Sequence, residues 1–311
     1  MIGTHASNYH CDDVTGTVIL RYTKEYQHHK VLRSLDMNEL NKCDLVFDIG
    51  GIYDHSQKKY DHHQRGYFET FSPNHTIKLC GCGLLYKHYG NEIIRNAIES
   101  LHLEPLSEDQ IEVLKYLLYD NFFAAIDADD NGIDCSPNEI LFRDQTTLGN
   151  RIRRLNARKE PFEKAQQLAE EAFLDILQNC YEIIKTQFPI VNQSYLSRFD
   201  VHSSGKIIVE TTGISCRECI DLVEKMNGKE EEILFIVQPD KARNQWKSTA
   251  LSKKNSFVPL KKFPEEWRGL RDEQLSKVSG VDDAVFVHSS GFLCCHKTFE
   301  GIMKMTIMAL E

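Results

Sequence analysis

The sequence lacks a hydrophobic run long enough to cross a membrane, because none of its apolar stretches approaches the roughly 20 residues that a span needs. It also lacks the basic leader and apolar segment of an export signal, and the Arg- and Ser-rich amphipathic leader of an organelle signal. No targeting peptide is therefore visible in this chain. We expect an intracellular protein of the cytoplasm or nucleus, with no membrane partner.

Paired cysteines are scarce as well. The chain has ten cysteines, but Cys216-Arg217-Glu218-Cys219 is its only CxxC, and a tetrahedral four-cysteine zinc site needs a second pair. Cys80-Gly81-Cys82 and Cys294-Cys295 are spaced too tightly to complete such a site easily. Their spacing does not suggest a disulfide framework either. The cysteines therefore predict neither a structural zinc ion nor a disulfide scaffold.

Positive charge is in deficit, since the net charge is −9, which argues against a protein that coats nucleic acid without specificity. The distribution is uneven. Residues 104–139 hold ten acidic side chains and one Lys, whereas residues 241–271 hold nine Lys or Arg and two Glu. This pattern fits a metal site in one half and a phosphate-holding surface in the other. On charge alone, two solvated surfaces are the simpler interpretation.

A chain of 311 residues is too long for one ordinary core and predicts two domains. The first half alternates apolar runs of strand length with helical patterns. Strands are predicted at residues 1–4 and 45–47, and helices at 14–22 and 79–89. Such alternation is typical of a parallel sheet covered by helices.

A long helix is predicted after Pro161, because apolar residues keep helical spacing as far as Ile184. Ser107 and Gln110 form a predicted capping box for an earlier helix that continues toward Asp127. Strand patterns return later, at residues 206–210, 233–237 and 284–288. We therefore predict an α/β protein of two lobes, with a parallel-sheet domain over residues 1–158, a connecting helix over 159–200 and a smaller α/β domain over 201–311.

Acidic and histidine side chains gather in the first lobe. Ligands collect beyond the carboxyl ends of strands in such sheets. Imidazole and carboxylate groups in this number suit a site for two divalent ions, Mn²⁺ or Mg²⁺, that activates water and holds a phosphate. The alternative is that each acid caps a helix or closes a turn, and that the paired histidines lie on a solvated turn. The candidate ligands, in chain order, are His5, His10, Asp12, Asp48, Asp61-His62-His63 and Asp127.

This series resembles the four-motif pattern of DHH-superfamily phosphoesterases, and most closely a DHH-like branch, the melanocyte-proliferating-gene exonuclease family. The resemblance covers nearly the whole chain. His10 stands where the general DHH pattern has an acid. The resembling stretches are MIGTHASNYHCDD (1–13), VFDIGGIYD (46–54), YDHHQRGYFETF (60–71), KLCGCGLLYKHYG (78–90), AAIDADDNGI (124–133), LGNRIRRLN (148–156), FPEEWRGLRDEQLSKVSGV (263–281) and VFVHSSGFLCCHKTFEGIMKM (285–305).

The resemblance implies a two-lobed, metal-dependent 3′–5′ RNA exonuclease that acts on single-stranded RNA, and part of the family is mitochondrial. By position, it implies that His63 contacts the scissile phosphate and that Asp61 orients a histidine. It implies one metal held by His5, His10 and Asp48, and a second held by Asp12, Asp48, His62 and Asp127, with Asp48 bridging.

The second lobe resembles the substrate-binding domain of the same superfamily. The family pattern has two glycines where Cys294 and Cys295 stand, so their side chains are expected to crowd a backbone contact with phosphate. Trp267 and Phe292 fit either core packing or base stacking. The alternative for the charged candidates is a solvated face. The implied substrate contacts are Arg268, Arg271, His288, Ser289, His296 and Lys297.

Two rival functions remain open at this point. One is a phosphoesterase of small molecules or short oligonucleotides, which would use the same metal site. The other is a non-catalytic nucleic-acid- or protein-binding module that has kept the fold. The sequence also leaves the oligomeric state open, and a homodimer is one alternative.

Overall fold

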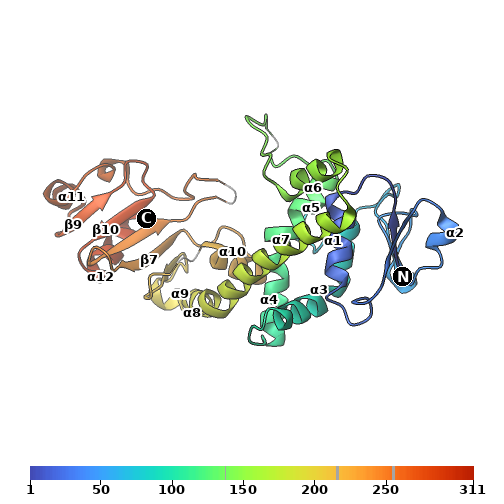
Figure 1. Ribbon diagram of the computed structural model, residues 1–311. Helices are drawn as coiled ribbons and strands as arrows, with labels where there is room; N and C mark the ends of the chain where they lie inside the picture. The colour runs from blue at the N-terminus through green and yellow to red at the C-terminus, as the bar shows by residue number, and fades with distance from the viewer. Residues whose placement is uncertain (137, 215–216, 254–255) are drawn as a thin grey trace. The chain divides into compact units, whose positions relative to one another are not determined.

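The structure is a computed structural model that describes residues 1–136, 138–214, 217–253 and 256–311 (Figure 1). The chain divides into two compact units, Met1–Tyr181 and Glu182–Glu311. The segment predicted to connect two lobes, residues 159–200, is a helical run that is shared between the two units. It comprises α7 (Phe162–Glu182), a π-helix (Ile183–Gln187) and α8 (Phe188–Leu196).

The sheet of the first unit has the strand order β2-β1-β3-β5-β4. Its strands are β1 (Ile2–His5), β2 (Val31–Ser34), β3 (Leu45–Phe47), β4 (Tyr53–Asp54) and β5 (Lys59–Tyr60). The pairs β1/β2, β1/β3 and β3/β5 are parallel, but β4 runs antiparallel to β5. The sheet is therefore mixed rather than purely parallel. Only a short 3₁₀ turn (His55–Gln57) and Lys58 join β4 to β5, which is too little chain for a parallel crossover.

Helix α1 (Cys11–Leu20) lies at the centre of this unit, since all ten of its residues are buried. Gly16 allows the close approach to the sheet, because a side chain there would collide with the Phe47 ring. The remaining helices are α2 (Met37–Leu40), α3 (Gly81–Ser100), α4 (Glu108–Leu118), a π-helix (Tyr119–Phe123), α5 (Ala124–Asp130) and α6 (Leu148–Ala157). The capping box of Ser107 and Gln110 is confirmed at the start of α4.

The second unit contains a mixed sheet of order β6-β7-β8-β10-β9, in which only β6 and β7 pair in parallel. Its strands are β6 (Ile207–Val209), β7 (Phe235–Asp240), β8 (Gln245–Ala250), β9 (Ala284–Val287) and β10 (Leu293–His296). Its helices after α8 are α9 (Arg198–Val201), α10 (Arg217–Met226), α11 (Asp272–Ser279) and α12 (Phe299–Leu310), with a 3₁₀ turn at Glu265–Trp267. One apolar core holds this unit together and includes Phe235, Phe263, Trp267 and Met305.

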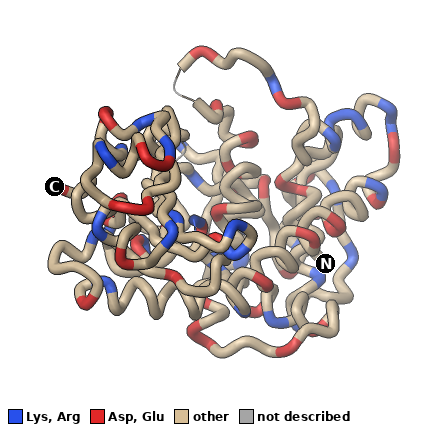
Figure 2. Tube along the Cα trace, turned by 90° about the vertical axis from the view of Figure 1, so that its left-hand side faces the viewer, with Lys and Arg blue, Asp and Glu red and all other residues tan. Residues whose placement is uncertain are grey.

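The structure bears on the CxxC cysteines and on the prediction that the chain has no membrane span. Cys219 is buried in α10, whereas Cys216, the first residue of the CxxC, lies outside the described residues. Across the described ranges, no helix combines the length and the hydropathy of a membrane span. Figure 2 shows acidic and basic residues interspersed along the trace.

Candidate metal centre

Three strand ends position the core of the candidate site. β1 ends at His5, β3 is followed directly by Asp48, and β5 is followed by Asp61-His62-His63. Because these three strands run parallel, their carboxyl ends meet at one edge of the sheet. Helix α1 starts immediately after His10 and brings Asp12 in its first turn to the same edge.

The backbone around Asp48 is shaped to aim its carboxylate. Asp48 has a φ of 57°, in the left-handed region that few residues other than glycine adopt, and Gly50 and Gly51 continue the turn. Helix α3 begins beside it, and a Cβ on Gly81 would lie only 2.9 Å from the Asp48 Cβ. The absence of a side chain at Gly81 therefore lets the helix start against this carboxylate.

Imidazole nitrogens surround the Asp48 carboxylate without forming aligned hydrogen bonds to it. The His5 Nε2 lies 3.3 Å from Asp48 Oδ2, and the His62 Nε2 lies 3.4 Å from Asp48 Oδ1. The same His62 nitrogen lies 3.0 Å from Asp130 Oδ2. Two groups of ligand atoms gather here, each with all its atoms within 4.8 Å of one another. They are Asp48, Asp61, His62 and His63, and His10, Asp12 and Asp130.

Buried polar atoms without partners are the strongest feature of this centre. Leaving a buried carboxylate without a partner is costly in free energy, and the cost is avoided when a cation binds it. Divalent ions would satisfy these oxygens and nitrogens together, so the donor set fits the ions that the motifs imply. Among the described residues of this centre, the buried side-chain atoms that form no hydrogen bond are His5 Nε2, both Asp12 carboxylate oxygens, Asp48 Oδ1, His62 Nε2 and Asp130 Oδ2.

The pKa values show how strongly these charges act on one another. Burial, together with the nearby Asp48 and Asp130 carboxylates, raises the pKa of Asp12 well above its usual range. The Asp48 carboxylate, 3.3 Å from the His5 Nε2, raises the pKa of His5 to about 9. Burial lowers the pKa of His62, but Asp130 and Asp48 outweigh it and raise it to about 9. A surplus of buried acid thus attracts positive charge to the centre.

Asp61 and His63 form a hydrogen-bonded pair at the rim. Asp61 Oδ1 lies 2.7 Å from His63 Nδ1 and also accepts from the His63 backbone N–H, while Oδ2 accepts from the Gly51 N–H. Burial would raise the pKa of Asp61, but these hydrogen bonds hold it below its usual value. The His63 side chain is 62% exposed, so its other ring nitrogen is accessible to a substrate.

Asp127 is placed differently from the other predicted ligands. Its carboxylate is fully buried in α5 and accepts hydrogen bonds from the Cys80 N–H, at 2.8 Å, and from the Tyr119 O–H, at 2.8 Å. Gly83 leaves room for it, since a Cβ at that position would collide with Oδ1. Burial raises the pKa of Asp127 to about 7. Asp127 therefore accepts a hydrogen bond from the residue that precedes α3, a capping role of the kind considered as the alternative to metal binding.

Three residues of the centre were not anticipated from the sequence. Asp130 lies one helical turn after Asp127, and that spacing is the signal that could have indicated it. Asp13 accepts from the His10 N–H at 2.7 Å, and its Oδ2 lies 3.4 Å from His5 Nε2. Arg33, a residue of β2, places its guanidinium 3.4 Å from the same Asp13 oxygen, and no local pattern in the sequence indicates this contact.

Three of the predicted substrate contacts in the second unit lie on its surface or at half-buried positions. Ser289 and Arg271 are exposed, and the Arg271 guanidinium lies 4.1 Å from the centre of the Phe286 ring. Arg268 is half-buried, and its Nε donates to the Phe263 carbonyl at 2.9 Å. These side chains are held by their own unit, but their guanidinium or hydroxyl groups are not buried in its core.

The two predicted histidines of the second unit differ in accessibility. His288 is half-buried and bonds to Ser290 Oγ at 2.7 Å through Nδ1. His296 is 2% exposed, its Nε2 lies 2.7 Å from the Asp282 carbonyl, and its Nδ1 accepts from the Thr298 N–H. Both ring nitrogens of His296 are thus engaged within the fold. Lys297, next to it, is exposed and pairs with an acid.

The residues at the position of the implied glycines lie inside the second sheet. Cys294 and Cys295 occupy β10, between β8 and β9, and both are buried. The Cys294 Sγ lies 3.8 Å from the Met305 Sδ in the core. Burial raises the pKa of Cys295 to about 11, so neither thiol is poised to ionise near neutral pH. Trp267 is also buried in the core, so core packing, and not base stacking, describes its position.

The whole chain is similar to one family of proteins. The family model described as "Uncharacterised protein family (UPF0160)", with the short name MYG1_exonuc, matches residues 1–310. The chain is 33% identical to the MYG1 protein of Caenorhabditis elegans over 327 residues, which cover 100% of this chain and 95% of the relative. It is 34% identical to MYG1 exonuclease of Homo sapiens over 322 residues, which cover 98% of this chain and 84% of the relative. The similarity therefore extends over both compact units.

Proposed function

Because this chain belongs to the MYG1 exonuclease family, we propose that it is a two-metal phosphodiesterase, a 3′–5′ exonuclease that releases nucleoside monophosphates from single-stranded RNA. The observation that carries the proposal is the set of buried histidine and carboxylate atoms that form no hydrogen bond, although they lie close together at the carboxyl edge of the first sheet. In a purely structural cluster, these buried oxygens and nitrogens would be joined to one another by hydrogen bonds.

We assign the two ions to overlapping sets of ligands. His5, His10 and Asp48 would hold one, and Asp12, Asp48 and His62 the other. Asp130 takes the place predicted for Asp127, because its Oδ2 forms no hydrogen bond among the described residues and lies 3.0 Å from His62 Nε2, whereas both Asp127 oxygens already accept hydrogen bonds. When bound, Mn²⁺ or Mg²⁺ would lower the pKa of a water molecule and neutralise charge on the phosphate.

His63 would act on the phosphate itself. Its Nδ1 faces Asp61, which fixes the ring orientation and leaves Nε2 directed to solvent. The hydrogen bond to Asp61 raises the pKa of His63, so that the protonated ring can donate from Nε2 to a phosphate oxygen or to the departing 3′-oxygen. Asp61 is thereby a positioning residue, and His63 is the group that touches the substrate.

The second unit would supply contacts to the RNA. Arg268, Arg271, His288, Ser289 and Lys297 have accessible groups for this role. His296 does not, because its nitrogens are engaged with Asp282 and Thr298. We assign His296 to the support of the β10–α12 connection instead.

The test uses 5′-labelled single-stranded RNA with purified protein and Mn²⁺. We expect stepwise shortening from the 3′ end, release of mononucleotides, and a loss of rate of at least about 100-fold in Asp48→Asn, which keeps the size of the side chain. The matched control is Asp44→Asn, an exposed acid that follows no strand end. Absence of shortening by the wild-type protein, or equal shortening by Asp48→Asn, contradicts the proposal.

A dinucleotide belongs in the same experiment. The phosphoesterase of short substrates would use the same metal centre, so only the substrate range separates the two activities. Rates per enzyme that are far higher for the dinucleotide than for long RNA would move the assignment to that class.

A further inference from the structure

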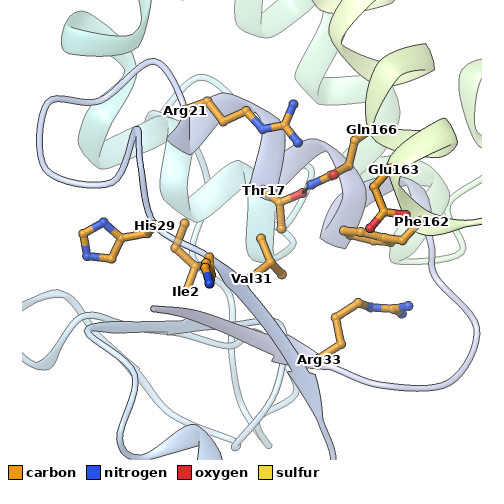
Figure 3. A pocket seen from close by; sticks show the side chains of 10 residues that line it. Ile2, Thr17, Arg21, His29, Val31, Arg33, Phe162, Glu163 and Gln166 are labelled. Atoms are coloured by element: carbon orange, nitrogen blue, oxygen red, sulfur yellow. Dashed lines mark hydrogen bonds between the residues drawn. The ribbon is translucent and has the colours of Figure 1, made fainter.

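A cavity of about 480 Å³ lies in the first unit, beside the edge strand β2. Figure 3 shows side chains from β1 and β2, from α1 and from the start of α7 around it. Its size falls in the range of small-molecule and cofactor sites, so a ligand of nucleotide size would fit.

The charged groups around this cavity favour an anion. Arg21, Lys30 and Arg33 line it, whereas Glu163 is the one acidic residue among the described residues that line it. Arg21 is 41% exposed and lies 3.4 Å from Glu170 Oε2, a contact through only one of its guanidinium nitrogens. The buried Nε of Arg33 has no hydrogen-bond partner among the described residues. A phosphate would therefore meet more positive than negative charge among the lining residues.

One wall of the cavity is apolar and is formed by Ile2, Val31 and Phe162. Ile2 is buried, and the Phe162 ring lies 4.5 Å from the Arg33 guanidinium carbon, so that ring and guanidinium form one platform. Helix α7 begins at Phe162, which places the positive end of its dipole at this wall. An apolar wall in a cavity that is also lined by cationic side chains suits a ligand that has a flat base and a phosphate.

Arg33 also joins this cavity to the metal centre. Its guanidinium lies 3.4 Å from Asp13 Oδ2 and donates to the Ser7 carbonyl at 3.3 Å. The same Asp13 oxygen lies 3.4 Å from His5 Nε2. A phosphate on Arg33 would consequently lie two side chains away from a metal ligand.

From this arrangement, we propose that the cavity is a second nucleotide site, which binds a phosphate through Arg21, Lys30 and Arg33 and a base against Ile2, Val31 and Phe162. The bound unit belongs either to the RNA strand or to a free nucleotide, and the strand as its source rests on the proposed function. In either case, the site lies outside the predicted metal ligands and outside the predicted contacts of the second unit.

The test measures binding to the metal-loaded full chain with two ligands: a phosphorothioate-linked single-stranded RNA, which keeps its charge and resists hydrolysis, and a nucleoside monophosphate. The variant Arg21→Gln/Lys30→Gln removes two cations from the cavity. Lys42→Gln, an exposed lysine on the neighbouring α2–β3 connection, is the matched control. For RNA, we expect weaker binding and a salt dependence that falls by roughly 0.7 in log–log slope for each lost phosphate contact.

A second variant, Val31→Phe, fills the cavity without changing its charge, and we expect it to weaken binding as well. Loss of RNA affinity alone identifies the strand as the source, and loss of mononucleotide affinity identifies a free nucleotide. The proposal is overturned if both variants bind both ligands as tightly as Lys42→Gln at every salt concentration.

Cleavage of a dinucleotide separates this inference from the proposed function. The double variant should cleave it at the wild-type rate, because its metal ligands are intact. If the wild-type protein cleaves nothing, the proposed function fails, while the binding measurement still decides the role of the cavity.

Discussion

The exchange of roles between Asp127 and Asp130 provides the sharpest test of the metal centre. We expect Asp130→Asn to weaken Mn²⁺ binding without destabilising the metal-free protein, because the change removes a half-buried negative charge that acts on Asp12. We expect Asp127→Asn to destabilise the metal-free protein without weakening Mn²⁺ binding. An amide there disturbs the hydrogen bonds from Cys80 and Tyr119, at a cost of about 1–3 kcal/mol, and leaves the free oxygens of the centre in place.

The size of the effect follows from linkage. An ion present at about 100 times its dissociation constant stabilises the protein by about 2.7 kcal/mol, and a 100-fold loss of affinity removes nearly all of that. At about 2–4 °C per kcal/mol for a unit of this length, the Mn²⁺-induced rise in Tm should fall by roughly 5–10 °C in Asp130→Asn. In Asp127→Asn, the metal-free Tm should drop by roughly 2–12 °C while the Mn²⁺-induced rise persists.

Differential scanning fluorimetry, with and without Mn²⁺ and after treatment with a chelator, measures both quantities on both variants. The reasoning is refuted if Asp130→Asn retains the full Mn²⁺-induced rise. It is equally refuted if Asp127→Asn loses that rise while its metal-free Tm is unchanged, because Asp127 would then be a ligand and not the anchor of α3.

Three further predictions follow from individual side chains. Gly83→Ala should lower stability by about 1–3 kcal/mol in urea unfolding, because its Cβ collides with Asp127, whereas Gly228→Ala, with open space around it, should not show a collision of this kind. His63→Gln should reduce kcat by about 100-fold and leave the Mn²⁺-induced rise in Tm unchanged; loss of that rise would make His63 a ligand. Burial and the nearby His55 lower the pKa of His88 to about 4, below its unfolded value of 6.5. The unfolded state therefore binds more protons between these values, so stability should decline as pH falls from 6.5 to 4, and urea midpoints of His88→Phe should decline less.

The positions of β1 and β3, and of the candidate ligands that follow them, are indicated by local patterns, whereas β2, β4 and β5 were not predicted. The apolar run that ends at Phe47 identifies β3, and its end places Asp48 at the carboxyl edge of the sheet. Likewise, the glycine pair Gly50-Gly51 indicates a turn directly after this strand end. A strand end and a glycine turn depend on residues that are adjacent in the sequence, so both can be predicted without a structure.

The roles of Asp127, Asp130 and His296 depend on partners that are distant in sequence. Cys80 immediately precedes α3, whereas Asp127 lies in α5, and Tyr119 belongs to a π-helix that no local pattern indicated. His296 resembles a substrate contact in sequence until Asp282, fourteen residues away, is seen to occupy one of its nitrogens. The strands β8 and β10 were missed for a related reason, since their polar and cysteine-containing sequences become strands only through pairing.

The start of α3 has a consequence for how this protein tolerates mutation. Gly81 and Gly83 bind nothing, yet the space that they leave is filled by Asp48 and Asp127. In a saturation screen for activity, these two positions should therefore accept as few substitutions as the acids beside them. A map of intolerant positions would then include residues whose contribution is an unfilled volume, and a search restricted to reactive side chains would overlook them.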